Sequence, residues 1–441
     1  MGSLELIAVA AVVCSAALII SQAKHRERVI AVAIGMSAGL IGIQVLRVHV
    51  FTLLVVLWLL TLNGRANYGA GKRIAWLVTC SALVSVTAAI GDLVVSPTLA
   101  LQLLAFAGSA SIILAKATSR DRKDMLYGLL GLVSVSSVLG LLQVAKIVPI
   151  EIWHAHVSSV GRPIGIYSEP DWLGLFAGLG LILAWRLPLQ PTIRTLLIST
   201  NAAALIFAFA RAAWIGVGAS VALIVVLALI HQKGRPRPGM VKGGRWPAVA
   251  LVVAAGLTFL SLNPAFASDF TKRLLGTFSV GSADISGQAR VRQIDSLLDI
   301  AETAPWYGHG LSANGRVGIW GGFNAGAASD TTNAVSSNWL LAMWVDGQFL
   351  ALPLIVLLIG VAFYTARTIA GQLLLVVLLN SLFSNATFQP VTWLLVALAL
   401  STAWDNDEVQ FSSPDGRALP SGQSVSRTRL ERPLNTRVAG R

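Results

Sequence analysis

Apolar runs dominate this chain, and most of them are long enough to cross a lipid bilayer. A helix needs about 20 apolar residues to cross a hydrocarbon core about 30 Å thick. Such runs lie at 4–20, 29–46, 48–62, 74–90, 98–115, 125–148, 171–185, 195–210, 212–230, 247–262, 348–365, 369–385 and 390–404. The pattern predicts an all-α fold, a polytopic membrane bundle of about 12–13 transmembrane helices within residues 1–404.

Two segments fall outside these runs. Residues 405–441 are polar and rich in Pro, Ser, Gly and Arg, so we expect a disordered cytoplasmic tail. Residues 263–338 form the longest polar stretch between spans and predict an extracytoplasmic loop or lid. Within it, residues 287–303 have the apolar period of a helix. Arg290 falls on the apolar face of this helix, and Arg292 falls on the opposite face.

Basic residues mark one side of the predicted membrane. Lys and Arg favour cytoplasmic loops, and here they gather in every second loop, at 24–28, 65–73, 116–123, 186–194, 233–245 and 367. This topology accounts for most of the net charge of +13, so we expect no nucleic-acid partner. With 55% hydrophobic and 12% charged residues, the chain is not a soluble enzyme. Residues 4–20 show no cleavage site, and we expect this run to be retained.

A minority of basic residues lie on the outer side, against this bias. They are Arg47, Lys146, Arg162, Arg211, Lys272, Arg273, Arg290, Arg292 and Arg316. Arginine suits bidentate binding of phosphate or carboxylate groups, so an anionic ligand on the outer side is one explanation. The alternative is that Arg simply outnumbers Lys throughout the chain. The positions of the individual residues must decide between them.

Arg211 and Arg162 are the best placed of these residues. Arg211 has apolar sequence on both sides, so only a tight outer turn fits around it. A charge at such a depth usually pairs, faces a wet cavity or extends to the interface. Arg162 begins a run in which Gly and Pro interrupt the helix before the next span, and broken backbone at that depth usually lines a cavity. Arg162 and Tyr167, in the same run, are candidate substrate-binding residues.

Several ionisable groups are candidates for proton transfer. Glu169 and Asp171 lie two residues apart in the run that begins at Arg162, where they can form an ion pair with it. A desolvated carboxylate is instead a better base near neutral pH. His309, between two glycines, is either a base, a phosphate ligand or a solvated side chain. No set of side chains has metal-ligand spacing, so we expect neither a metal nor a cofactor.

Short motifs follow one another in a fixed order on the predicted outer side. They are Arg162 with Gly165 and Asp171, the run 211–214, Arg290 with Pro305, the run 308–310, and the run 337–340 with Asp346-Gly347. With this series, residues from about 160 to 365 resemble the bacterial O-antigen ligase and O-antigen polymerase family of membrane glycosyltransferases.

The resemblance implies a GT-C-like bundle in the bacterial cytoplasmic membrane, with an active site that faces outward. Such a protein moves a glycan from a polyprenyl (undecaprenyl) diphosphate carrier to a glycan or glycolipid acceptor, without metal or cofactor. Arg211 and Arg290 match motif positions that stabilise the departing diphosphate. Asn338, Asp346 and Arg292 are further candidate substrate-binding residues.

The chain departs from the ligase pattern at one position. Ligases have a His-Asn pair before the re-entering helix, whereas this chain has Ser337-Asn338. A serine hydroxyl is not a base near neutral pH. Four residues are candidates to replace it: Glu169, Asp171, His309 and Asp346. The change favours a polymerase, whose acceptor is another lipid-linked repeat unit, over a ligase.

Two other classes of protein remain open. An anion or small-solute transporter also fits many spans with arginines between them. Transporters usually contain paired repeats, and we find no convincing similarity between the two halves. A scaffold for other envelope enzymes is the third class.

Overall fold

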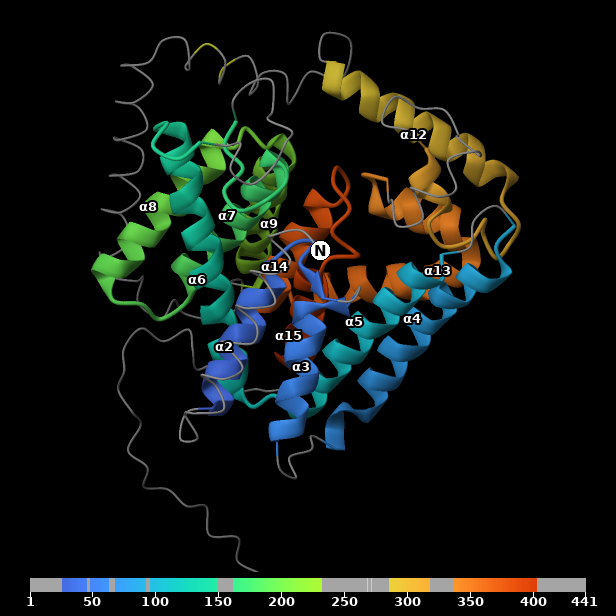
Figure 1. Cartoon of the computed structure of the whole chain (residues 1–441), viewed down its shortest axis with the longest axis horizontal. Coiled ribbons are helices and arrows are strands. Elements are labelled where there is room, and N and C mark those ends of the chain that lie inside the picture. Colours follow the sequence, from blue (N-terminus) through green and yellow to red (C-terminus); the bar gives the residue numbers. More distant parts are fainter. Residues whose placement is uncertain are drawn as a thin grey trace, which may run out of the picture. The chain divides into compact units, whose positions relative to one another are not determined.

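The computed structural model describes residues 26–45, 48–62, 68–92, 96–149, 162–231, 268, 271, 285–317 and 336–402. Twelve α-helices account for most of these residues (Figure 1). They are α2 (Arg26–Ala38), α3 (Val50–Thr61), α4 (Gly71–Ile90), α5 (Pro97–Lys116), α6 (Ser119–Val144), α7 (Pro170–Arg186), α8 (Pro191–Phe207), α9 (Arg211–His231), α12 (Ile285–Thr303), α13 (Trp339–Tyr364), α14 (Ile369–Asn380) and α15 (Pro390–Thr402). The predicted fold class is confirmed for this part of the chain.

The helices agree with a multi-pass membrane protein. Among the described residues, α4, α5, α6 and α13 are each long and apolar enough to cross a bilayer. The helices α3, α8, α14 and α15 are apolar but shorter, and so is the part of α9 from Arg211 to Leu227. The predicted spans at 4–20 and 247–262, the predicted tail at 405–441 and much of the predicted lid lie outside the described residues.

Several predicted spans differ from the helices in their bounds, and two of them differ most. The run at 29–46 is helical only to Ala38, and Gln44–Val45 (β1) then pairs with Val48–His49 (β2) in a short antiparallel ladder. Gly42 lies between them with φ +75°, a left-handed conformation that glycine adopts without steric cost. The run predicted at 348–365 is part of α13, which begins at Trp339 and is interrupted at Gln348 (φ 41°, ψ −122°).

α7 lies among several other helices. It packs against α6, α8, α9 and α14. Most of its residues are buried, including Leu173, Leu175 and Phe176. Its close approach to α9 depends on Gly174, where a Cβ would overlap that of Ala210. The first residues of α7, which the sequence singled out, are therefore surrounded by other segments of the bundle.

α6 runs from one end of the bundle to the other. Its N-terminal turns contain the basic run at 116–123, which the sequence places on the cytoplasmic side. At its other end, Gln143 binds the segment that precedes α7. Lys123 and Gln143 are 20 residues apart, which corresponds to about 30 Å of helix. This is close to the thickness of a hydrocarbon core, also about 30 Å, so the start of α7 and the basic run lie at opposite ends of a span.

Candidate functional site

The segment before α7 is fixed in place by one side chain of α6. Gln143 Oε1 accepts hydrogen bonds from the backbone N–H groups of Ile164 (2.9 Å) and Gly165 (2.8 Å). Its Nε2 donates to the Gly165 carbonyl at 3.1 Å. Gly165 has φ +60°, and a Cβ there would overlap Ser136. The Gly/Pro break predicted from the sequence is thus an ordered turn that presents Arg162, Glu169 and Asp171 at the end of the bundle.

Asp171 brings together two arginines from distant parts of the sequence. Arg162 Nη1 donates to Asp171 Oδ1 at 3.4 Å, and Arg290 Nη2 donates to Asp171 Oδ2 at 3.3 Å. The side chains of Arg162, Arg290 and Asp171 are 19%, 29% and 24% exposed, respectively. One carboxylate therefore orients two guanidinium groups, and both remain partly open to solvent. The prediction that Arg290 lies on the inner face of its helix agrees with this position.

Arg290 also contacts the turn between α14 and α15. Its guanidinium carbon lies 5.8 Å from the centroid of the Phe383 ring, within the range of a cation–π interaction. The same turn meets the start of α13, because Trp339 N–H donates to the Ser381 carbonyl at 3.1 Å. The first turns of α12 and α13 and the end of α14 thus meet beside the start of α7.

Arg211 begins α9 near the same region. It follows Ala210, which packs against Gly174, one turn after Asp171. Farther along α9, Gly216 packs closely on the last turn of α14, where a Cβ would lie 3.2 Å from the Val376 carbonyl oxygen. Arg211 is therefore held at the same end of α7 as Asp171.

Glu169 differs from Asp171 in its environment. It precedes Pro170 at the N-cap of α7, is exposed, and makes no hydrogen bond or ion pair with the described residues. Although Glu169 is exposed, atoms packed around its carboxyl group remove part of its hydration and so raise its pKa above 4.5, and the Asp171 carboxylate raises it further. The guanidinium groups of Arg162 and Arg290 lower it in part. Glu169 is thus a carboxyl group with an elevated pKa and an open face, close to both arginines.

The family comparison matches this region. Residues 195–347 match the model of a protein family described as O-antigen ligase. The match includes Arg211 and Arg290, whereas Arg162, Glu169 and Asp171 precede it. No curated protein matches the chain. That family transfers glycans in the membrane, with lipid-linked glycans as substrates. Among the described residues of this chain, four helices are long and apolar enough to cross a bilayer.

Ser337 and Asn338, where the chain differs from the ligase pattern, both lie in the described part of the structure. The Ser337 hydroxyl donates to Gln293 Oε1 of α12, three residues after Arg290. Asn338 caps α13, because its Oδ1 accepts from the N–H groups of Leu340 (3.1 Å) and Leu341 (3.2 Å). Ser337 therefore lies close to the arginines, while the Asn338 oxygen is used within the fold.

His309 and Asp346 organise the segment that follows α12. His309 is 3% exposed. Its Nδ1 lies 2.8 Å from Asp92 Oδ1, and its Nε2 lies 3.0 Å from the Ile300 carbonyl oxygen. Both ring nitrogens thus face acceptors. Arg290 and Ile300 are ten residues apart in α12, which is about 15 Å of helix, so His309 lies well away from the arginines.

Asp346 is buried beneath the same segment. Its Oδ2 accepts from Ser312 N–H (2.9 Å) and from the Asn314 side chain (2.6 Å), and its Oδ1 accepts from Asn314 N–H (2.9 Å). At 1% exposure, the carboxylate positions the loop that contains η4 (Ala313–Arg316).

Two further candidates do not face the arginines. Arg292 is exposed on the outer face of α12, as its helical position predicts. Tyr167 is buried, with its ring stacked on Phe176 at a centroid distance of 4.7 Å. Burial raises the pKa of Tyr167. Sequence reasoning missed Gln143, Gln293, Phe383 and Asp92. Of these, Asp92 alone carried a signal, since it follows Gly91 at the outer end of a predicted span.

Proposed function

We propose that this protein transfers a glycan from a polyprenyl diphosphate carrier to an acceptor hydroxyl on the outer side of the cytoplasmic membrane. The observation that carries the proposal is the cluster at the start of α7, where Asp171 holds Arg162 and Arg290 and where α9 begins with Arg211. The outward orientation is supported by α6, whose opposite end contains the basic run at 116–123.

In this reaction the acceptor oxygen attacks the anomeric carbon of the donor sugar. The bond from that carbon to the diphosphate oxygen breaks, and its electron pair leaves with the diphosphate. Guanidinium groups that are already oriented stabilise such developing charge most effectively, because they need no reorganisation during the step. Arg162, Arg211 and Arg290 supply these groups. Asp171 keeps two of them oriented before the donor binds.

The acceptor hydroxyl loses its proton in the same reaction, and Glu169 is the residue we assign to accept it. A general base works best when its pKa approaches the operating pH, and the pKa of Glu169 is raised. The other candidates are already engaged in the fold. Asp171 binds two arginines, Asp346 binds the 312–314 loop, and His309 faces Asp92 and a backbone carbonyl.

The polymerase assignment follows from Ser337. A ligase of this family has histidine at this position, and here the Ser337 hydroxyl is bound to Gln293. We therefore assign an acceptor that is a second lipid-linked repeat unit. It approaches Glu169 laterally from the membrane, and the reaction needs no metal ion.

The experiment uses the purified full chain in vesicles with lipid-linked repeat unit as the donor. One reaction contains only this lipid-linked repeat, and a second also contains a finished surface glycolipid as acceptor. We expect polymer and free polyprenyl diphosphate in both. Transfer that occurs only with the glycolipid would make the protein a ligase, and no transfer in either reaction would contradict the enzyme assignment.

A further inference from the structure

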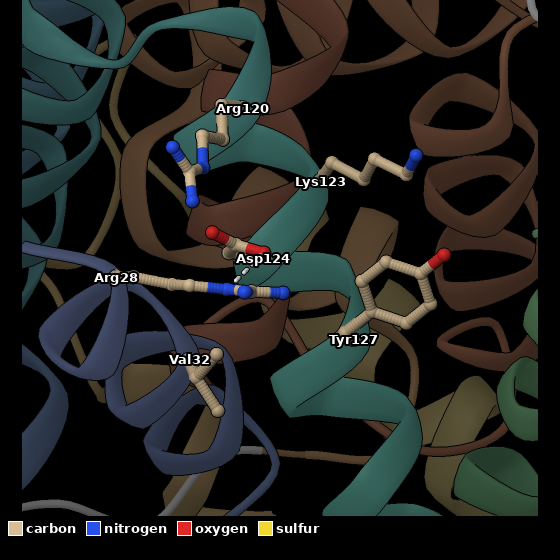
Figure 2. Close-up of a pocket in the computed structure, with 6 residues that line it drawn as sticks. All are labelled: Arg28, Val32, Arg120, Lys123, Asp124 and Tyr127. Carbon is tan, nitrogen blue, oxygen red and sulfur yellow. Dashed lines mark hydrogen bonds and ion pairs between the residues drawn. The ribbon is translucent and has the colours of Figure 1, made fainter. Parts of the chain in front are cut away.

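A hollow lies between α2 and α6, at the end of the bundle opposite the arginine cluster. Its volume is about 430 Å³, and it is lined by Arg28, Val32, Arg120, Lys123, Asp124 and Tyr127 (Figure 2). Beyond the hollow, the two helices that form it pack closely side by side (Figure 1). A Cβ at Gly128 would overlap the Val32 carbonyl, and one at Gly35 would overlap the Met125 carbonyl.

The charge in this hollow is unbalanced. Three cationic side chains line it with one carboxylate. Arg28 Nε donates to Asp124 Oδ1 at 3.3 Å, and Lys123 lies 5.9 Å from the centroid of the Tyr127 ring. Arg120 is exposed and makes no hydrogen bond or ion pair with the described part of the chain. Positive-inside topology explains cations in the two basic runs at 24–28 and 116–123, but it does not explain why cations from both runs converge on one hollow.

Asp124 gives the hollow a second polar feature. Its side chain is 5% exposed, and Figure 2 shows the carboxyl group between Arg28 and Arg120. Oδ1 is bound to Arg28, whereas Oδ2 is buried and has no hydrogen-bond donor among the described residues. A buried carboxylate oxygen without a donor is unfavourable. The hollow thus places cations suited to a phosphate beside a carboxylate that is already bound to Arg28.

Exposed apolar surface continues from the hollow along both helices. On α6, Gly131, Val135 and Val138 follow Tyr127 at helical spacing and are exposed. On α2, Met36 follows Val32 one turn later and is 40% exposed. A free phosphate ion needs no such surface, whereas the acyl chains of a phospholipid would lie against it.

We propose that this hollow binds the headgroup of an anionic glycerophospholipid of the inner leaflet, such as phosphatidylglycerol. Arg120 and Lys123 bind its phosphate, and its acyl chains lie along the exposed apolar surface of α2 and α6. Basic pockets between helices on the cytoplasmic side are suited to such headgroups. The site is about 30 Å along α6 from the arginine cluster and is independent of the glycan-transfer proposal.

The test measures retention of lipid by the purified full chain in detergent, by native mass spectrometry, together with its melting temperature. The probes are phosphatidylglycerol, phosphatidylcholine and inorganic phosphate. The double variant Arg120→Gln/Lys123→Gln removes two charges from the hollow. Lys72→Gln/Lys116→Gln is the matched control, since these lysines are on the same predicted side and outside the hollow. Val32→Trp fills the hollow without a change of charge.

We expect wild type and the control to prefer phosphatidylglycerol over phosphatidylcholine and to melt higher in its presence. Arg120→Gln/Lys123→Gln should bind phosphatidylglycerol about 30-fold more weakly, since each cation near a lipid surface contributes about fivefold. Val32→Trp should lose the preference as well. The proposal is overturned if both variants keep it, if the control loses it equally, or if inorganic phosphate alone raises the melting temperature as much as the lipid does.

Discussion

Arg290→Gln removes a guanidinium group that contacts both Asp171, at 3.3 Å, and the face of Phe383, at 5.8 Å. The cost to stability should be small. The ion pair is partly exposed, and such pairs contribute at most about 1 kcal/mol. The cation–π contact adds a further 0.5–1 kcal/mol or so. We therefore expect the variant to fold and to lose about 1–2 kcal/mol of stability.

The expected effect on catalysis is larger. Removal of one oriented donor from a developing anion typically lowers the rate by about 10²- to 10³-fold, or roughly 2.7–4 kcal/mol. Arg290→Lys should fall between wild type and Arg290→Gln, because it keeps the charge but lacks the planar fork of donors. Lys146→Gln is the control, since Lys146 is an exposed cation on the same predicted side.

The assay is the initial rate of polyprenyl diphosphate release from lipid-linked repeat by purified protein. A double-mutant cycle with Asp171→Asn separates the two roles of Arg290. If Arg290 served only to pair with Asp171, either single variant and the double variant would lose activity equally. We expect a smaller loss in Asp171→Asn than in Arg290→Gln. A rate in Arg290→Gln within about threefold of the Lys146→Gln rate would refute the charge-stabilisation argument.

Four further predictions concern the base, its pH dependence, the loop and the metal. Glu169→Gln should lower the transfer rate by about 10²- to 10⁴-fold with donor binding retained. The reaction requires ionised Glu169, and Arg162 lowers the pKa of Glu169. Arg162→Gln should therefore move the acid limb of the pH–rate profile to higher pH. An acid limb that does not move contradicts the assignment of Glu169 as the base. Asp346→Asn should leave hydrogen-bond donors of the 312–314 loop unpaired, and each unpaired donor should lower the stability by about 1–3 kcal/mol. Amide hydrogen exchange at 309–316 should therefore be faster than in the control variant Asp295→Asn. Equal protection in the two variants contradicts the role of Asp346 in anchoring the loop. Treatment with EDTA should leave the transfer rate unchanged, and loss of activity that Mg²⁺ restores contradicts metal independence.

Sequence periodicity predicted the helices well where one face is buried. The helix expected at 287–303 is α12 at Ile285–Thr303. Val291, Leu297 and Leu298 lie on the face where the apolar period places the buried side; Leu297 is buried, but Val291 and Leu298 are 48% and 44% exposed. The buried side is instead completed by Ala289 and Gln293. Because glutamine is polar, the apolar period does not count it as buried. The buried face predicted from the sequence was therefore centred on the larger apolar side chains instead.

The contacts that build the site were not predictable in the same way. Asp171 and Arg290 are 119 residues apart, and Asp92 and His309 are 217 apart. No helical or strand period relates residues at such separations. The sequence identified the outer arginines by their conflict with positive-inside topology, but which carboxylate orients them depends on how α7 and α12 pack.

The central claim is that Arg162, Arg211 and Arg290 hold a diphosphate as its sugar departs. Binding of radiolabelled undecaprenyl diphosphate to the purified protein tests it most directly. We expect saturable binding that weakens in each of Arg162→Gln, Arg211→Gln and Arg290→Gln, remains in Lys146→Gln, and is competed by lipid-linked repeat. Binding of equal strength in wild type and all three arginine variants would contradict the account.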